Sequence, residues 1–221
     1  MKVLVIGATG KVGSGIINSC RDMGFECRAF VRDSKYVKQF QSIGVETVIG
    51  NLHDDMSSAF DGCDHVVFSA GSGAKSGAEA TLLVDLWGSI LAIEQAEKSG
   101  VSHFIMISSL KADDPLNGPD KIQHYLVARN IADARLLNSN ISNKIVLRPG
   151  RLLDEPGTGM LSREFDWDDK TNKHTTVTRE DVVGLVINIL AKPILTGSIV
   201  EFINGQVNIN NFVDKYRNIE E

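Results

Sequence analysis

The chain is poor in the residues that mark several protein classes. Its only cysteines are Cys20, Cys27 and Cys63, an odd number without the C-x-x-C spacing of metal and redox motifs. We therefore expect reduced, mostly buried thiols in a cytoplasmic protein rather than a disulfide framework. The apolar runs are too short to span a bilayer, and the first run, 3–6, is too short for the core of a signal peptide.

A large excess of one charge is also missing. The formal net charge is −5 and no long basic run occurs, which argues against nucleic acid or an anionic membrane as the main partner. The histidines lack metal-ligand spacing, so no metal site is expected. Neither a Walker A sequence nor a G-x-S-x-G elbow is present to support nucleotide hydrolysis or esterase chemistry. The remaining expectation is a small-molecule substrate, and the sequence leaves the oligomeric state open.

What the chain does contain is a regular alternation of short apolar runs and amphipathic stretches. The expected strands are 3–6, 27–31, 45–49, 65–68, 104–107 and 144–147, and the expected helices are roughly 12–23, 78–98 and 121–138. Continuous valine and isoleucine runs indicate strands covered on both faces. The alternation predicts a doubly wound parallel sheet, a Rossmann fold with helices on both faces. We expect one domain over 1–221 with a small C-terminal substrate-side extension.

The alternation breaks after Pro149. Residues 151–175 include glycines, a proline and several acids, and they predict an irregular loop that contacts substrate together with residues 110–123. Thr178 followed three residues later by Asp181 predicts a capped helix start, and the helix is expected to run to about Ala191. A late strand over 199–203 and a short terminal helix follow.

A glycine-rich turn lies between the first strand and the first helix. Gly7, Gly10 and Gly13 match the spacing of a dinucleotide-binding turn, in which the glycines allow the sharp turn, the approach of the pyrophosphate and close helix–strand packing. The helix N-terminus then offers free N–H groups and a partial positive charge to the phosphates. The alternative is a plain tight turn, but its position at the start of a βαβ series favours dinucleotide binding.

The end of the second strand bears on the choice between NADP and NAD. Arg32 stands where a guanidinium can bind a 2′-phosphate, and Lys11 in the turn can add a second cation. Asp33 is adjacent and would favour NAD if the register differed by one residue. The alternative for Arg32 is a solvated surface charge. We expect NADP, with NAD possible.

With these residues placed, the chain resembles the short-chain dehydrogenase/reductase superfamily, closest to its atypical NAD(P)H-binding, NmrA-like or epimerase/dehydratase-like members. The resemblance covers nearly the whole chain, and its marks are Gly7 to Gly13, Gly50-Asn51-Leu52-His53-Asp54, Ser69-Ala70-Gly71, Ile107-Ser108-Ser109, Tyr125-Leu126-Val127-Ala128-Arg129, Leu147-Arg148-Pro149-Gly150 and Thr178-Arg179-Glu180-Asp181-Val182.

The resemblance implies roles for these positions. Ser109 would orient a substrate carbonyl or hydroxyl, and Tyr125 would be the proton donor or acceptor. Relatives carry a lysine four residues after the tyrosine, where it holds the nicotinamide ribose. This chain has Arg129 there, which keeps the charge but has a different reach and cannot exchange a proton. Efficient hydride chemistry is therefore in question.

The candidate site residues fall into two sets. The catalytic candidates are Ser109, Tyr125 and Arg129; their alternatives are a strand-end cap for Ser108-Ser109 and a half-buried tyrosine beside a solvent-facing arginine. The cofactor-binding candidates are Gly7, Thr9, Gly10, Lys11, Val12, Gly13, Arg32, Asn51, Leu52, Ser69, Ala70, Gly71, Ser108 and Pro149.

The leading functional hypothesis is an NADP-dependent oxidoreductase or epimerase/dehydratase-like enzyme acting on a small carbonyl or hydroxyl compound. A non-catalytic NADP(H)-binding sensor is the alternative from another class, and a flavin or quinone reductase is the third.

Overall fold

The computed structural model describes residues 1–73, 76–165 and 175–217. Within them, a nine-stranded sheet has the order β11-β8-β10-β6-β5-β4-β1-β2-β3. Its parallel strands are β1 (Lys2–Ile6), β2 (Glu26–Val31), β3 (Glu46–Ile49), β4 (His65–Phe68), β5 (His103–Ile107), β6 (Asn143–Pro149) and β10 (Ile199–Asn204). The predicted doubly wound parallel sheet is confirmed.

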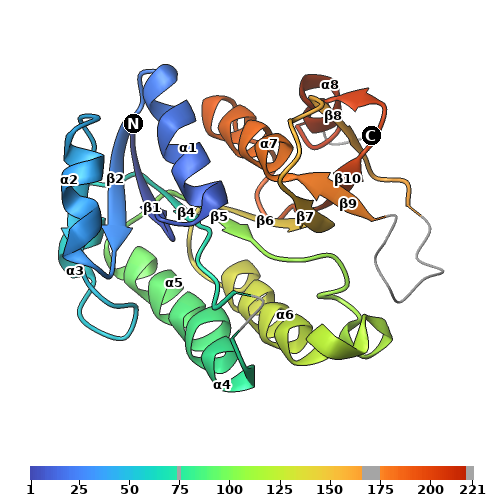
Figure 1. Ribbon diagram of the computed structural model, residues 1–221, viewed down its shortest axis with the longest axis horizontal. Helices are drawn as coiled ribbons and strands as arrows, with labels where there is room; N and C mark the ends of the chain where they lie inside the picture. Colours follow the sequence, from blue (N-terminus) through green and yellow to red (C-terminus); the bar gives the residue numbers. More distant parts are fainter. Residues whose placement is uncertain (74–75, 166–174, 218–221) are drawn as a thin grey trace.

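Helices cover both faces of this sheet. α1 (Lys11–Asp22) and α7 (Arg179–Ala191) lie on one face, and α5 (Ser89–Lys98) and α6 (Gln123–Leu137) lie on the other (Figure 1). The shorter elements are α2 (Val37–Gln41), α3 (Ser57–Phe60), α4 (Ala78–Ala80), α8 (Ile209–Asp214) and the 3₁₀ turns η1 (Ser34–Tyr36), η3 (Pro115–Asn117) and η4 (Asp120–Ile122). The expected helix 78–98 is present, but its middle part η2 (Thr81–Gly88) is π-helical.

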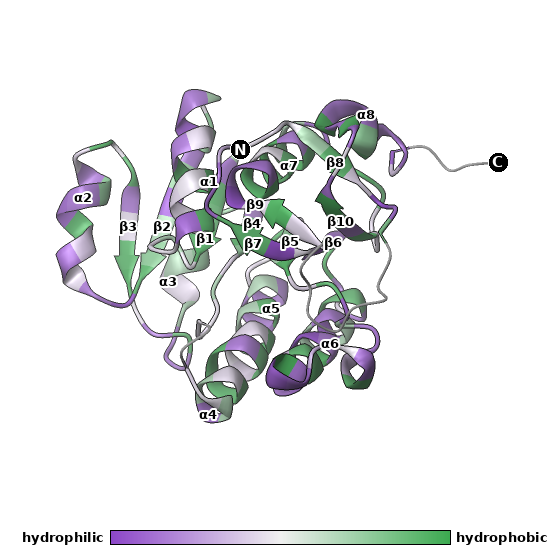
Figure 2. Ribbon diagram, turned by 45° about the vertical axis from the view of Figure 1, so that its right-hand side comes forward, coloured by the Kyte–Doolittle hydropathy of each residue, from purple (hydrophilic) through white to green (hydrophobic). Residues whose placement is uncertain are grey.

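The sheet divides the core into two layers because successive strand residues face opposite sides. In β1, Val3 and Val5 pack with the α1 and α7 layer, whereas Leu4 and Ile6 pack with the α5 and α6 layer. Figure 2 shows the apolar strands between helices whose outer faces are hydrophilic. The central strands are buried on both sides, which explains their continuous valine and isoleucine runs.

The prediction of an irregular loop over 151–175 is wrong in part. Short strands β7 (Arg151–Leu153) and β8 (Met160–Ser162) form there: β7 pairs in parallel with β9 (Thr176–Thr178), and β8 pairs antiparallel with β10 and with β11 (Val207–Asn208). Three-residue strands carry no readable periodicity, and their partners are distant in sequence. Residues 166–174 of this loop lie outside the described residues.

The start of α7 matches its sequence signal. The Thr178 hydroxyl accepts the Asp181 N–H at 3.1 Å. The Asp181 carboxylate in turn accepts the N–H groups of Thr158 (3.0 Å) and Gly159 (2.7 Å). Burial acts to raise the pKa of Asp181, but these backbone hydrogen bonds outweigh it and the pKa is lowered. The capped helix therefore also anchors the segment that leads into β8.

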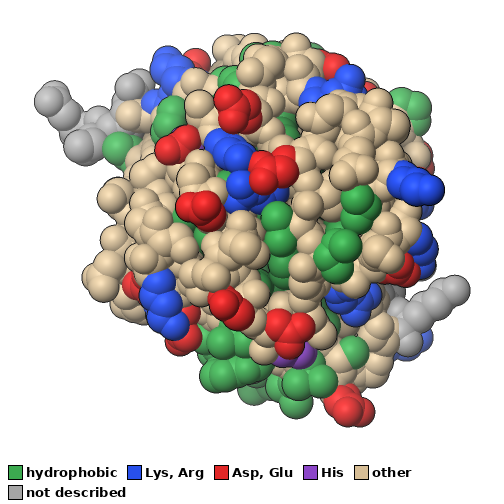
Figure 3. Space-filling model, turned by 90° about the vertical axis from the view of Figure 1, so that its left-hand side faces the viewer, with side chains coloured by type: hydrophobic (Ala, Val, Ile, Leu, Met, Phe, Trp, Pro, Cys, Tyr) green, Lys and Arg blue, Asp and Glu red, His purple; other side chains and the backbone are tan. Residues whose placement is uncertain are grey.

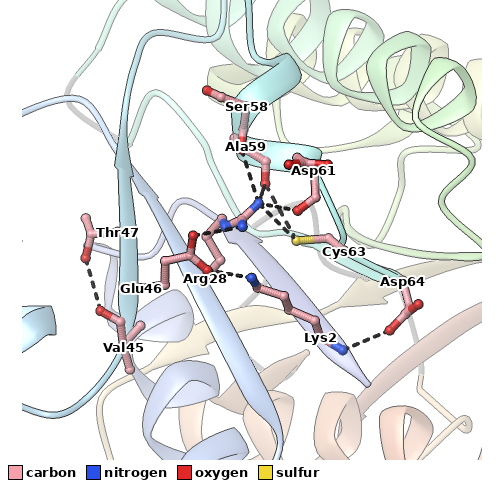
Figure 4. Close-up of polar contacts among 10 residues, drawn as sticks. All are labelled: Lys2, Arg28, Val45, Glu46, Thr47, Ser58, Ala59, Asp61, Cys63 and Asp64. Carbon is pink, nitrogen blue, oxygen red and sulfur yellow. Dashed lines mark hydrogen bonds and ion pairs between the residues drawn. The ribbon is translucent and has the colours of Figure 1, made fainter.

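A buried guanidinium fixes the β2–β3 edge of the sheet. Arg28 donates to the carbonyl oxygens of Ser58, Ala59 and Asp61 at 3.1, 2.9 and 2.7 Å, and it pairs with Glu46 at 2.8 Å. Figure 4 shows these oxygens, from α3 and the residue that follows it, converging on one guanidinium. Since α3 follows the loop after β3, this contact holds one wall of the candidate site in place.

The outer surface over α2 and α3 is mixed in charge. Figure 3 shows lysine and arginine side chains interspersed with aspartate and glutamate on this face.

Among the helices of the described residues, none combines the length and apolarity needed to cross a membrane.

Candidate functional site

The turn from β1 into α1 is built for close backbone approach. Gly7 has φ +88°, and its carbonyl accepts the Gly10 N–H at 3.0 Å. A Cβ on Gly13 would lie 2.2 Å from the Gly7 oxygen, so only glycine fits there. Gly10 caps α1 without a side-chain hydrogen bond, and the first turn of the helix holds no acid. The N–H groups of that turn are therefore available to an anion, which fits the diphosphate of a dinucleotide.

A cavity of about 750 Å³ opens beside this turn at the carboxyl ends of the strands. Nine of the predicted cofactor-binding residues line it: Gly7, Thr9, Gly10, Arg32, Asn51, Leu52, Ser69, Ala70 and Gly71. β1 lies between β2 and β4 in the sheet, so the cavity lies where the strand order reverses. Ligands of open parallel sheets bind at this topological position.

The end of β2 presents two cations and a carboxylate that is already engaged. Arg32 and Lys35 are exposed and line the cavity. The Asp33 carboxylate accepts the Lys35 N–H at 2.9 Å and pairs with the Lys35 Nζ at 2.8 Å. The hydrogen bond from the Lys35 side chain lowers the pKa of Asp33. Asp33 thus caps η1, and its neighbour Arg32 is part of the cavity lining.

Three predicted residues of the turn do not line the cavity. The exposed Lys11 ammonium pairs with Asp154 at 2.6 Å, and Arg179 pairs with the same carboxylate at 2.7 Å. The Lys11 contact lowers the pKa of Asp154. Val12 and Gly13 are buried between α1 and the sheet, so they shape the turn from behind.

The half-buried Tyr125 and the buried Arg129 form a pair on α6 beside the cavity, and neither side chain is part of its lining. Arg129 is 3% exposed; its Nε donates to the Tyr125 hydroxyl at 3.3 Å, and its Nη2 donates to the Ala70 carbonyl at 2.9 Å. Nη2 also pairs with Asp85 at 3.0 Å. The solvent-facing alternative for Arg129 is therefore wrong, because packing of α6 on η2 places Asp85 against it.

The two serines after β5 have separate environments. The buried Ser108 hydroxyl donates to the Asp133 carboxylate at 2.9 Å, and Arg148 binds the same carboxylate at 3.0 Å. Burial raises the pKa of Asp133 against these contacts. The half-buried Ser109 hydroxyl donates to the Leu110 carbonyl at 3.1 Å.

The strand exit at Pro149 is held by the backbone. Its carbonyl accepts the Leu110 N–H at 3.0 Å, so Pro149 links β6 to the segment after β5. Neither Ser108 nor Pro149 lines the cavity. Within the described chain, no three histidine, cysteine or acidic side chains converge as metal ligands would.

The structure adds cavity residues that the sequence did not indicate. Ser72 and Ser76 continue the Ser69-Ala70-Gly71 stretch, so the serine- and glycine-rich composition was a usable signal. Asp85, which is buried outside the cavity lining, had no such signal, because its contact with Arg129 joins residues 44 positions apart. The other added lining residues are Ile6, Phe30, Val31, Lys35, Tyr36, Ala80, Leu83 and Val84, while the lining residues Asp33 and His53 were already indicated by the sequence.

Comparison with known proteins agrees with this geometry. Residues 7–193 match the family model described as NAD(P)H-binding. The uncharacterized sugar epimerase YhfK of Bacillus subtilis is 37% identical over 191 residues, covering 85% of this chain and 86% of that protein. The UPF0659 protein YMR090W of Saccharomyces cerevisiae is 33% identical over 226 residues, covering 96% and 97%.

A solved structure shares the fold over almost its full length. It is a Bacillus halodurans protein assigned to the NAD-dependent epimerase/dehydratases, with a TM-score of 0.89 and 37% identity, covering 97% of this chain and 99% of that one.

Proposed function

Because the chain belongs to the NAD(P)H-binding family, among the atypical short-chain dehydrogenases/reductases, we propose that it is an NADP-dependent oxidoreductase acting on a small carbonyl or hydroxyl compound. One observation carries the proposal. The Tyr125 hydroxyl is bonded to Arg129, and Arg129 is bonded to Ala70 in the cavity wall. The phenol that would transfer the proton is thus linked through Arg129 to a residue of the cavity wall.

The contacts indicate which residues would bind the cofactor and which would act on the substrate. The N–H groups at the start of α1 and the close Gly7–Gly13 packing would hold the diphosphate. Bound NADP(H) supplies or accepts the hydride. Tyr125 would give a proton to, or take one from, the substrate oxygen, and Arg129 would fix the phenol through its Nε–H. Ser109 would bond the substrate oxygen after turning away from the Leu110 carbonyl.

The preference for NADP rests on the β2 end. Arg32 and Lys35 line the cavity, and Asp33 is held by Lys35. A guanidinium binds a phosphate dianion through paired, charge-assisted hydrogen bonds. An aspartate engaged in a local cap is less available to a ribose hydroxyl. Both contacts favour the cofactor with the 2′-phosphate.

A non-catalytic NADP(H) sensor is the second candidate. The observation that favours it is the Arg129–Asp85 ion pair, because the cation at the lysine position is already engaged. Such a protein would bind the cofactor without turning over a substrate.

The test combines binding with turnover. NADPH and NADH are titrated first, and NADPH oxidation is then followed with aldehydes, ketones, quinones and flavins. Tyr125→Phe should reduce kcat for carbonyl substrates by roughly 10²- to 10⁴-fold and leave the cofactor Kd nearly unchanged. Tyr216→Phe, the same substitution near α8, is the matched control and should keep full turnover.

Each other outcome selects against the proposal. Tight binding without turnover across the panel supports the sensor. Quinone or flavin reduction that survives Tyr125→Phe points to the third hypothesis, a reductase that needs no tyrosine. Absence of binding for both cofactors would refute all three.

A further inference from the structure

A buried carboxylate that the proposed chemistry leaves unused lies directly behind the tyrosine–arginine pair. Asp85 is 1% exposed and sits in the π-helical segment η2. One of its oxygens pairs with the Arg129 Nη2 at 3.0 Å, and the other accepts the Ser72 N–H at 3.0 Å. It thus joins α6 to the loop after β4, which forms part of the cavity wall.

The local structure leaves Asp85 little freedom. The Ser89 hydroxyl donates to the Asp85 carbonyl at 2.7 Å within the helix. A Cβ on Gly71 would lie 3.0 Å from the Asp85 carboxylate and 3.5 Å from the Arg129 Nη2, so the ion pair packs tightly under this cavity residue. π-helical turns inside α-helices occur often at functional sites.

The guanidinium is not fully bonded. Its Nη1 is buried and has no hydrogen-bond partner within the described part of the chain. Burying a guanidinium without a partner of opposite charge would cost folding free energy. Asp85 is the carboxylate that forms an ion pair with Arg129 and lowers this cost. The phenol of Tyr125 therefore faces a cation whose charge a second group offsets.

A second buried carboxylate, Asp133 on α6, also acts on Arg129 through its charge, but its hydrogen bonds go to Ser108 and Arg148. The other charged groups on the packed elements have partners elsewhere or face solvent. Arg148 also pairs with Glu201, Arg135 pairs with Glu97, Lys111 pairs with Asp114, and Asp120 accepts a hydrogen bond from Gln123. Glu79, Asp113, Lys121 and His124 are exposed.

We propose that Asp85 is a positioning residue for the Tyr125–Arg129 pair and biases the site toward reduction. Its carboxylate holds the guanidinium against the Ala70 carbonyl and offsets part of its charge. Tyr125 then acts as the proton donor. This inference rests on the proposed function, and it narrows the substrate class to compounds with a reducible carbonyl.

The step balances as a carbonyl reduction. A bound reduced nicotinamide would supply the hydride to the carbonyl carbon and would itself be oxidised, and the electron pair of the C=O π bond would move to oxygen. That oxygen takes the proton of the Tyr125 hydroxyl as the O–H bond breaks. The phenolate left behind recovers a proton from water, and the product is an alcohol.

The test uses ionisation of the phenol, which requires neither cofactor nor substrate. The chain has only three tyrosines, so the tyrosinate absorbance of each protein minus that of its own Tyr125→Phe version isolates one group. Asp85→Asn keeps the size of the side chain but removes the charge. Its Tyr125 phenol should ionise about one pH unit lower than in the unmodified chain, a tenfold change in the ionisation constant.

The matched control is Glu97→Gln, which removes a carboxylate paired with Arg135 on the same helix, away from the tyrosine. Its midpoint should not move. A midpoint in Asp85→Asn that is unchanged, or higher, overturns the proposal. Because the titration needs no turnover, it separates failure of this inference from failure of the proposed oxidoreductase.

A second variant covers the case in which Asp85→Asn does not fold. The double variant Asp85→Asn/Arg129→Gln buries no net charge. Its Tyr125 midpoint is compared with that of Arg129→Gln alone, which keeps the Asp85 carboxylate. The double variant should ionise at lower pH than Arg129→Gln, because a nearby negative charge disfavours the phenolate. Equal midpoints in these two variants would overturn the proposal.

Discussion

Replacing Arg32 with alanine should affect the affinity for NADPH and the affinity for NADH differently. Arg32 is exposed at the end of β2 and lines the cavity, and the adjacent Asp33 is engaged with Lys35. If Arg32 binds the 2′-phosphate, its loss weakens NADPH binding and leaves NADH binding nearly unchanged. The quantity of interest is the ratio of the two Kd values.

The size of the effect follows from charge and exposure. Two unit charges about 4 Å apart attract by roughly 4 kcal/mol at an effective dielectric constant near 20. Solvent and salt reach the exposed Arg32 and leave roughly a third of that attraction. Since about 1.4 kcal/mol is tenfold in affinity, the Kd for NADPH should rise about tenfold.

The assay is a fluorescence or calorimetric titration of both cofactors. The matched control is Lys38→Ala, which removes an exposed cation of α2 outside the cavity lining and should alter neither Kd. The NADPH preference of the unmodified chain should also shrink as salt is added.

Two results would refute this reasoning about the β2 end. Equal weakening of NADPH and NADH in Arg32→Ala would mean that Arg32 acts on a part common to both cofactors. An unchanged NADPH affinity would mean that Arg32 is a solvated surface charge.

Two further predictions concern the turn and the protein interior. Gly13→Ala should weaken cofactor binding at least tenfold, because the new Cβ would lie 2.2 Å from the Gly7 carbonyl oxygen. The control is Gly77→Ala, whose new Cβ would meet open space. Full cofactor affinity in Gly13→Ala would contradict this account of the turn. His103 is 2% exposed, and burial lowers its pKa to about 4, so the folded chain resists protonating it. Its contribution to the free energy of unfolding is present above about pH 6.5 and is lost as the pH falls toward about 4, by on the order of 3 kcal/mol. Urea unfolding across this range should show a shallower loss in His103→Leu, and an equal loss would exclude His103 as its source.

The sequence predicted most of the fold because its main strands and helices have recognisable patterns of apolar residues in neighbouring positions. Buried parallel strands need continuous apolar runs, and the predicted strands differ from the observed ones only at their ends. The face of α1 that holds Val12, Ile16 and Ile17 is buried as its spacing predicts. The strands β7 and β8 were missed because each has three residues and is held by partners far along the chain.

The candidate site likewise has a part that depends on neighbouring residues and a part that depends on residues far apart in the sequence. Gly7 and Gly10 line the cavity because a turn between adjacent elements depends on adjacent residues. Lys11 lies in that turn, yet its ammonium pairs with Asp154 from a later loop. The direction of a long, flexible side chain depends on charges brought near it by folding, which local spacing does not encode.

The sequence alone determined the glycine-rich turn, since its requirements are a backbone without Cβ atoms and a helix start, both set by consecutive residues. Only the tertiary structure decided the electrostatics of the pair on α6. The partner of Arg129 is Asp85, 44 residues away, and packing of two helices on one face of the sheet brings them together. The electrostatic effect of a buried charge depends on the groups that surround it in the folded structure.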